Sequence, residues 1–178
     1  FRAVADDVRR GGFTDVLLAH GVASVVAVDV GYGQMISRLA GDPRVTVRDR
    51  TNFRFADPEA LGSPFDLVVV DVSFISVTLL AANLAAAGRE GSHYVVLVKP
   101  QFEVGRSGVG AGGIVRDPAG HRVAVMNVGT SLAAHEIGPR GLIASPVRGT
   151  KGNQEFLLHA VKGEPAIDAD ILLEGVVE

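Results

Sequence analysis

Cysteine is absent from the 178 residues of this chain, which excludes disulfides, thiolate metal sites and a cysteine nucleophile. Its absence is also consistent with a reducing compartment. No apolar run reaches the roughly 18 residues needed to cross a bilayer, and no basic-then-apolar leader opens the chain. The five histidines show no ligand spacing such as H-x-x-x-H, so we assign no metal. We therefore expect a cytoplasmic protein without stable membrane insertion.

Lysine is also scarce, with three lysines against fourteen arginines. Lys99 stands directly after the apolar run 95–98 and directly before Pro100. Such a run predicts a buried strand, and because proline cannot donate to a strand ladder, the strand should end at Lys99. Ligands of open α/β sheets bind at the carboxyl ends of the strands, which makes Lys99 a candidate base. The simpler alternative is a lysine that merely reaches solvent from a strand end.

The order of the expected elements predicts an α/β fold. Buried strands are expected at 24–30, 44–48, 65–71 and 91–99, and helical patterns at 13–20, 34–40, 77–87 and 117–135 separate or follow them. This alternation implies right-handed crossovers and a doubly wound, Rossmann-like, mostly parallel sheet with helices on both faces. The last two strands, 141–145 and 154–161, are joined by a short loop and should form a C-terminal antiparallel hairpin. We expect one domain over 1–162, followed by a polar tail at 163–178.

Carboxylates follow several of these strands. Asp29 and Asp71 each end a strand, and Asp49 does so less clearly. An acid at such a position commonly receives a ribose diol, although Asp29 can equally cap the turn ahead of Gly31. The pair Gly31 and Gly33 lacks the third glycine of a dinucleotide fingerprint, so a nicotinamide oxidoreductase is not favoured.

Asp71, Lys99 and Glu155 are expected to meet at one edge of the sheet. If the strands that end at Asp71 and Lys99 are neighbours, their backbones lie about 4.8 Å apart. The last hairpin strand begins near Glu155 and runs antiparallel, so its start should fall where the Lys99 strand ends. An ordinary ion pair and a solvated edge glutamate are the plain alternatives. Together, however, the three groups suit proton abstraction from a hydroxyl.

The charge of the chain says little about its partners. A net charge of −3 does not predict a nucleic-acid-binding protein. Arginines gather within 44–54 and again within 106–148, mostly in expected loops and strand ends. This distribution favours RNA only weakly, because most charged runs are simply solvated.

Seven regions of the sequence carry a family pattern: GGFTDVLL at 11–18, VDVGYGQ at 28–34, RTN at 50–52, DVSFIS at 71–76, VKPQFEVG at 98–105, GGIVRDP at 112–118, and ASPV with GNQEF within 144–156. They resemble the methyltransferase domain of the haemolysin A (TlyA) family. Members of that family are ribosomal RNA 2′-O-methyltransferases related to the FtsJ class. The resemblance covers residues 11–160.

The resemblance implies S-adenosylmethionine as the methyl donor and ribosomal RNA or ribosomal subunits as the partner. It also implies a Lys-Asp-Lys-Glu tetrad, in which Asp71, Lys99 and Glu155 match the aspartate, the second lysine and the glutamate. The implied cofactor contacts are Gly11, Gly12 and Phe13 near the methionine end, Asp29 on the ribose, Asn52 near the adenine, and also Val30 and Asp71.

Some parts of the family pattern are expected to be missing. The family's first strand and glycine loop should precede Gly11, and residues 7–10 leave no room for them. The first lysine of the tetrad and a small RNA-binding domain are expected upstream as well. Two other functions stay open. One is a haemolysin-like membrane-active protein, which the lack of spans and of a basic amphipathic helix disfavours. The other is a domain that binds RNA or S-adenosylmethionine without turnover.

Overall fold

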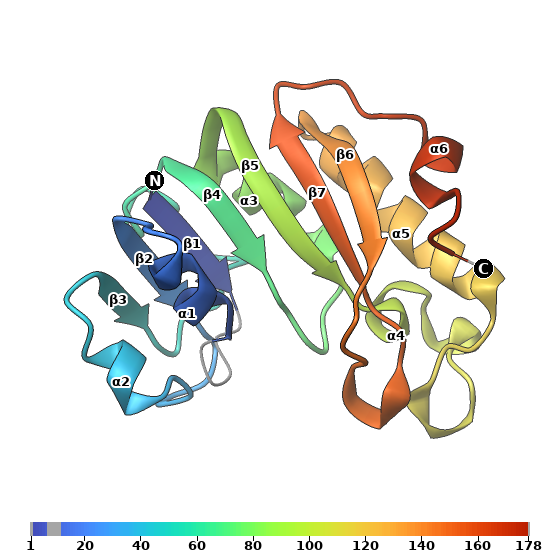
Figure 1. Ribbon diagram of the computed structural model, residues 1–178, viewed down its shortest axis with the longest axis horizontal. Coiled ribbons are helices and arrows are strands. Elements are labelled where there is room, and N and C mark those ends of the chain that lie inside the picture. The colour runs from blue at the N-terminus through green and yellow to red at the C-terminus, as the bar shows by residue number, and fades with distance from the viewer. Residues whose placement is uncertain (1, 7–11, 178) are drawn as a thin grey trace.

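The computed structural model describes residues 2–6 and 12–177 and is built on one seven-stranded sheet of order β3-β2-β1-β4-β5-β7-β6 (Figure 1). Five strands run parallel: β1 (Arg2–Asp6), β2 (Ser24–Val28), β3 (Val45–Arg48), β4 (Phe65–Val70) and β5 (Gly88–Val98). Strands β7 (Phe156–Lys162) and β6 (Ile137–Ala144) complete the sheet as an antiparallel hairpin. The predicted mostly parallel sheet with a C-terminal hairpin is confirmed.

Helices cover both faces of the sheet. Helices α1 (Gly12–Ala19) and α2 (Ser37–Ala40) pack Leu18 and Leu39 against Val25 on one face. On the other face lie α3 (Ala81–Ala87), entered through the 3-10 turn η2 (Val77–Leu80), and α5 (Pro118–Ala133). Figure 1 shows α3 and α5 behind the sheet and α1 in front of it. The chain is therefore doubly wound, as predicted.

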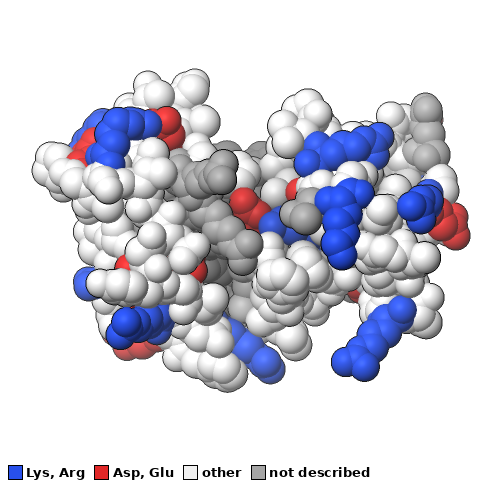
Figure 2. Space-filling model, turned by 90° about the horizontal axis from the view of Figure 1, so that it is seen from below, with Lys and Arg blue, Asp and Glu red and all other residues white. Residues whose placement is uncertain are grey.

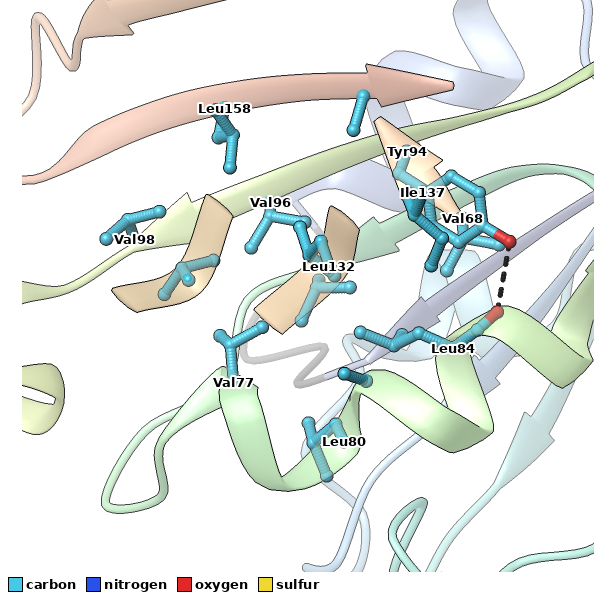
Figure 3. Close-up of a cluster of buried hydrophobic side chains, with 14 of the residues drawn as sticks. Val68, Val77, Leu80, Leu84, Tyr94, Val96, Val98, Leu132, Ile137 and Leu158 are labelled. Carbon is cyan, nitrogen blue, oxygen red and sulfur yellow. Dashed lines mark hydrogen bonds between the residues drawn. The ribbon is translucent and has the colours of Figure 1, made fainter. Parts of the chain in front are cut away.

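The larger core lies between the sheet and helices α3 and α5. Alternate residues of β5 point into it, so that Tyr94, Val96 and Val98 are fully buried. They meet Leu84 of α3 and Leu132 of α5, as Figure 3 shows. The Tyr94 hydroxyl donates a hydrogen bond of 3.0 Å to the Leu84 carbonyl oxygen, which gives the one polar atom of that ring a partner inside the core.

The expectation that the first strand is missing is wrong. Strand β1 lies in the interior of the sheet, paired in parallel with β2 on one side and β4 on the other. Its sequence, Arg-Ala-Val-Ala-Asp, has only three apolar residues between two charged ones, and so short an apolar run does not predict an interior strand. The hydrogen bonds to β2 and β4 along its two edges make this segment a strand, although its local sequence does not predict one. Residues 7–11, where the glycine loop was expected, lie outside the described residues.

The remaining segments are short. They are α4 (Pro100–Glu103), the 3-10 turns η3 (Arg106–Gly108), η4 (Ala111–Gly113) and η5 (Thr150–Gly152), and α6 (Ala169–Leu173). The segment expected as a polar tail also joins the core, because Leu173 and Val177 are buried in it. The expected helix at 34–40 is reduced to α2.

Candidate active site at the carboxyl edge of the sheet

The register of three strands brings the expected acid, amine and second acid to one edge. Val70 at the end of β4 pairs with Val96 of β5, and Val98 at the end of β5 pairs with Phe156 at the start of β7. Asp71, Lys99 and Glu155 are the next residues beyond these pairs. In Figure 1 this edge lies at the bottom, where the β4 and β5 arrows end and the β7 arrow begins.

Lys99 is held by two groups that follow β4. Its Nζ lies 2.7 Å from Asp71 Oδ1 as an ion pair and donates a hydrogen bond of 2.9 Å to Ser73 Oγ. The Lys99 side chain is 11% exposed and that of Asp71 is 27% exposed, so the pair is largely shielded from water. A shielded pair interacts more strongly than a surface pair, which fixes the amine at the sheet edge. Sequence reasoning found Asp71 and Lys99 but not Ser73.

Glu155 stands beside this pair in a more buried position. It is 7% exposed, and burial raises the pKa of its carboxyl, while the Lys99 charge and a hydrogen bond of 3.4 Å from Gln101 Nε2 act in the opposite direction. The Asp71 charge raises the pKa further. The carboxylate occupies the space beside Gly149 that a side chain there would need, since a Cβ at that position would lie 2.0 Å from Glu155 Oε1. Glu155 is thus confined to one position in the site.

A pocket of about 360 Å³ lies at this edge of the sheet. Lys99 and Glu155 lie on its wall together with Gln101, Phe102 and Lys151, and the pocket also touches Ser73, Phe74, Val109, Gly113 and Asn153. Phe74 is 80% exposed with φ +66, a left-handed conformation that is unusual for an aromatic residue. Its ring lies 5.3 Å from that of Phe102 between centroids. The pocket is therefore lined by polar groups and by two aromatic rings, of which Phe74 is exposed.

Glu103 connects the two loops that carry the site, and sequence reasoning missed it. The side chain is 8% exposed and accepts hydrogen bonds from Ser76 Oγ at 2.6 Å and from the Val77 backbone N–H at 2.9 Å. Burial raises the pKa of the Glu103 carboxyl, and these two bonds partly offset the effect. Because Glu103 ends α4 just after Lys99, its carboxylate ties that helix to the loop that carries Asp71 and Ser73. Its place in the K-P-Q-F-E segment was the available signal.

Asp29 presents an unsatisfied acceptor at the end of β2. It is 5% exposed, and its Oδ1 accepts a hydrogen bond of 2.6 Å from the Gly31 N–H, while its Oδ2 is buried without a hydrogen-bond partner among the residues that the structure describes. A Cβ on Gly31 would lie 3.0 Å from Asp29 Oδ1, so the backbone approaches the carboxylate closely. A buried carboxylate oxygen without a donor is costly unless a ligand supplies one, and a ribose hydroxyl is such a donor. The residues present therefore fit the ribose of a nucleoside cofactor.

The structure describes all but one of the other predicted cofactor residues. Gly12 and Phe13 open α1, and Gly11 lies outside the described residues. Val30, just after Asp29, is 68% exposed. Asn52 is exposed in the loop after β3, where its Oδ1 accepts a hydrogen bond of 3.1 Å from the Arg54 N–H. Its amide nitrogen has no hydrogen bond to any described residue. These placements leave their predicted roles as predictions.

The sheet edge is viewed face-on in Figure 2, which shows several separate groups of lysine and arginine around a hollowed centre. The chain as a whole is negatively charged, but the positive groups on this face are suited to contact a polyanionic partner. Within 2–6 and 12–177, no cluster of histidine and carboxylate side chains is suited to hold a metal ion. No helix in the same part of the chain is both long and apolar enough to cross a membrane.

A Rossmann-like sheet with an Asp-Lys pair and a buried glutamate at its carboxyl edge defines a class of nucleoside-cofactor enzymes. Comparison with known families makes the assignment specific, since the model of the FtsJ-like methyltransferase family matches residues 8–162. The chain belongs to the FtsJ-like methyltransferase family.

Two relatives resemble the chain at the level of sequence. The 16S/23S rRNA (cytidine-2′-O)-methyltransferase TlyA of Mycobacterium tuberculosis is 51% identical over 152 residues, which make up 83% of this chain and 55% of the relative. A solved structure named as a hemolysin from Streptococcus thermophilus is 36% identical, with a TM-score of 0.89 over 97% of this chain and 64% of the other. The chain spans about half the length of the curated relatives it matches.

More distant structures share the fold alone. The 16S rRNA (adenine(1408)-N(1))-methyltransferase W203A mutant from Catenulisporales acidiphilia, solved with the cosubstrate SAM, is 16% identical. It superposes with a TM-score of 0.62 over 94% of this chain and 88% of its own. The match confirms the predicted Rossmann-like methyltransferase sheet.

Proposed function

We propose that this chain is the catalytic domain of an S-adenosylmethionine-dependent enzyme that methylates a ribose 2′-hydroxyl of ribosomal RNA. The observation that carries the proposal is that Lys99 and Glu155 lie on the wall of one pocket at the sheet edge, with Asp71 paired to Lys99. The identity of 51% to TlyA supports the same substrate class. Ribosomal subunits would be the partner, and the enzyme would then act in the cytoplasm.

The cofactor would lie between the end of β2 and the edge that carries Lys99. Asp29 would accept hydrogen bonds from its ribose through the unpartnered Oδ2, with Gly12, Phe13, Val30 and Asn52 around it and residue 11 beyond the described segment. S-adenosylmethionine supplies, when bound, a methyl group on a positively charged sulfur. The chain itself has to place a nucleophile in line with that methyl and remove a proton.

Lys99 would perform that task on the target ribose. Asp71 and Ser73 fix its amine at the base of the pocket, within reach of a hydroxyl that enters from the Phe74 side. A 2′-hydroxyl is a poor nucleophile. Lys99 would act on it as the neutral amine, after its ammonium has given a proton to solvent, and would accept the hydroxyl proton as the oxygen–carbon bond forms and the sulfur–carbon bond breaks. The proton would then reside on Lys99 as the ammonium, which pairs with the Asp71 carboxylate. Glu155, confined beside them, would accept a hydrogen bond from the ribose and hold its orientation.

Transfer of a tritiated methyl group from S-adenosylmethionine to isolated ribosomal subunits tests the proposal. Lys99→Ala should lower kcat by about 10²- to 10⁴-fold, the usual contribution of a positioned acid–base group. Lys99→Arg keeps the charge but cannot lose a proton at working pH, so it should stay impaired if proton uptake matters. Cofactor affinity, measured by calorimetry, should be unchanged in both variants.

Arg122, which is half-exposed on α5, pairs with Asp170 and does not line the pocket, gives a control in which alanine should leave activity intact. A Lys99→Ala protein as active as the parent would remove Lys99 from the mechanism. A parent that binds the cofactor without methylating either subunit would instead favour the non-catalytic binding domain. Leakage of liposomes at neutral pH would favour the haemolysin-like alternative.

A further inference from the structure

The three lysines of the chain have three different surroundings. Lys99 pairs with Asp71, and Lys162 donates hydrogen bonds to the carbonyl oxygens of Ala85 and Gly88, where it helps to close the end of α3. Lys151 makes no hydrogen bond or ion pair with any residue in the described part of the chain. It is exposed, yet it lies on the wall of the same pocket as Lys99 and Glu155. Lys151 is therefore a cation without a partner among the described residues, on the wall of the pocket that holds Lys99.

The position of Lys151 is set by the loops on both sides of the pocket. The residue has φ +64 inside η5, a conformation that a side chain other than glycine adopts rarely. Its Nζ lies 3.7 Å from where a Cβ on Gly113 would be, so the amine reaches from the β6–β7 loop to the segment that ends η4. Asn153 joins the same two segments, with Oδ1 accepting from the Val115 N–H at 3.0 Å and Nδ2 donating to the Gly113 carbonyl at 3.0 Å.

Lys151 does not serve to neutralise Glu155. The charges that shift the pKa of Glu155 are those of Lys99 and Asp71. The Lys99 charge is in turn matched by Asp71, which leaves Lys151 as a positive group that no acid on the pocket wall compensates. The amine is therefore available to a negative group of the substrate, and lysine is a common point-charge ligand for phosphate.

We propose that Lys151 binds the phosphodiester on the 3′ side of the target ribose and thereby positions the 2′-hydroxyl at Lys99. This inference rests on the proposed function, because it assigns the anion that must accompany a ribose in this pocket. The 3′ phosphate is the one nearest to a 2′-hydroxyl along the RNA backbone, so a cation on the wall of the Lys99 pocket meets it first. Lys151 is a positioning residue in this scheme and takes no part in proton transfer.

Lys151→Ala, Lys151→Arg and the charge-matched control Arg122→Ala test the proposal in the same methyl-transfer assay on ribosomal subunits. Loss of one phosphate contact should raise KM for the subunits by about 10-fold and make the slope of log KM against log salt shallower by about 1. We expect kcat to change by less than about 3-fold, and Lys151→Arg to restore KM and slope. Arg122→Ala removes the same charge outside the pocket and should change neither.

A binding measurement separates this inference from the proposed function. Equilibrium binding of a fluorescein-labelled ribosomal RNA transcript, with S-adenosylhomocysteine present, needs no turnover and is titrated with salt for the same proteins. If the parent binds the transcript but transfers no methyl group, the proposed function fails and the salt slopes still decide the role of Lys151. A Lys151→Ala protein with the parent's affinity and salt slope, or an equal loss in Arg122→Ala, would overturn the inference.

Discussion

Replacing Glu103 by alanine should destabilise the protein by about 3 kcal/mol. The carboxylate accepts the Val77 N–H at 2.9 Å, and Val77 is 1% exposed, so truncation leaves a buried donor without a partner at a cost of about 1–3 kcal/mol. Removal of one buried methylene adds about 0.8 kcal/mol. The Ser76 hydroxyl loses less, because it keeps Thr78 Oγ1 at 2.7 Å.

Thermal unfolding followed by circular dichroism measures this loss. For a domain of this size, 1 kcal/mol shifts Tm by about 2–4 °C, so we expect Glu103→Ala to melt about 6–12 °C below the parent. Glu103→Gln should stay within about 1 kcal/mol of the parent, since an amide oxygen can accept from Val77 and an amide nitrogen can donate to Ser76 Oγ. The exposed Glu59 provides the control, and its replacement by alanine should leave Tm unchanged.

The contribution of Glu103 to the stability of the protein should decrease as pH rises. Burial raises the folded-state pKa of Glu103 above the unfolded value, so the folded protein holds the proton to higher pH than the unfolded chain. The contribution of Glu103 to stability is therefore full below the unfolded pKa and falls as pH rises through the folded pKa. Glu103→Gln should remove this fall and gain on the parent as pH rises. If Glu103→Ala melts with the parent, or the glutamine variant is as unstable as the alanine variant, the bonding assigned to Glu103 is wrong.

Two further predictions concern the site. Asp29→Asn keeps an acceptor for the Gly31 N–H but replaces Oδ2, the proposed acceptor of the ribose, with a donor. The Kd for S-adenosylmethionine, measured by calorimetry, should therefore rise by about 10- to 100-fold. An unchanged Kd would exclude the ribose contact. Gly149→Ala is compatible with the φ of −70 at this position but puts a Cβ 2.0 Å from Glu155 Oε1, so the Glu155 carboxylate has to move. This displacement should lower methyl transfer by about 10²-fold and leave cofactor affinity intact. Gly141→Ala, with no atom within 4 Å, is its control, and equal activities would show that the placement of Glu155 does not matter.

The positions of Asp71, Lys99 and Glu155 could be predicted because strand ends are visible in a sequence. An apolar run that stops at a charged residue gives the end of a strand, and the parallel or antiparallel sense of the neighbours gives the edge. Ser73 and Gln101 could not be found in this way. Their contacts depend on how the loops after β4 and β5 turn, including the left-handed Phe74, and polar loop residues carry no periodic pattern. Strand β1 was missed because its local sequence gives little indication of a strand. Its pairing with β2 and β4, which are distant in sequence, is what makes it one.

The antiparallel direction of β7 is what allows one sheet edge to hold both acids and the amine. In a parallel strand beside β5, the residue preceding the strand would lie at the amino edge, about 3.3 Å per residue away along the whole strand. Because β7 runs against β5, with Val98 opposite Phe156, the residue that precedes it lands next to the residue that follows β5. The hairpin with β6 fixes that direction and also places the β6–β7 loop, with Gly149 and Lys151, over the same pocket. A change that shifts the β5–β7 register by one residue would therefore turn Glu155 away from Lys99 without altering either residue.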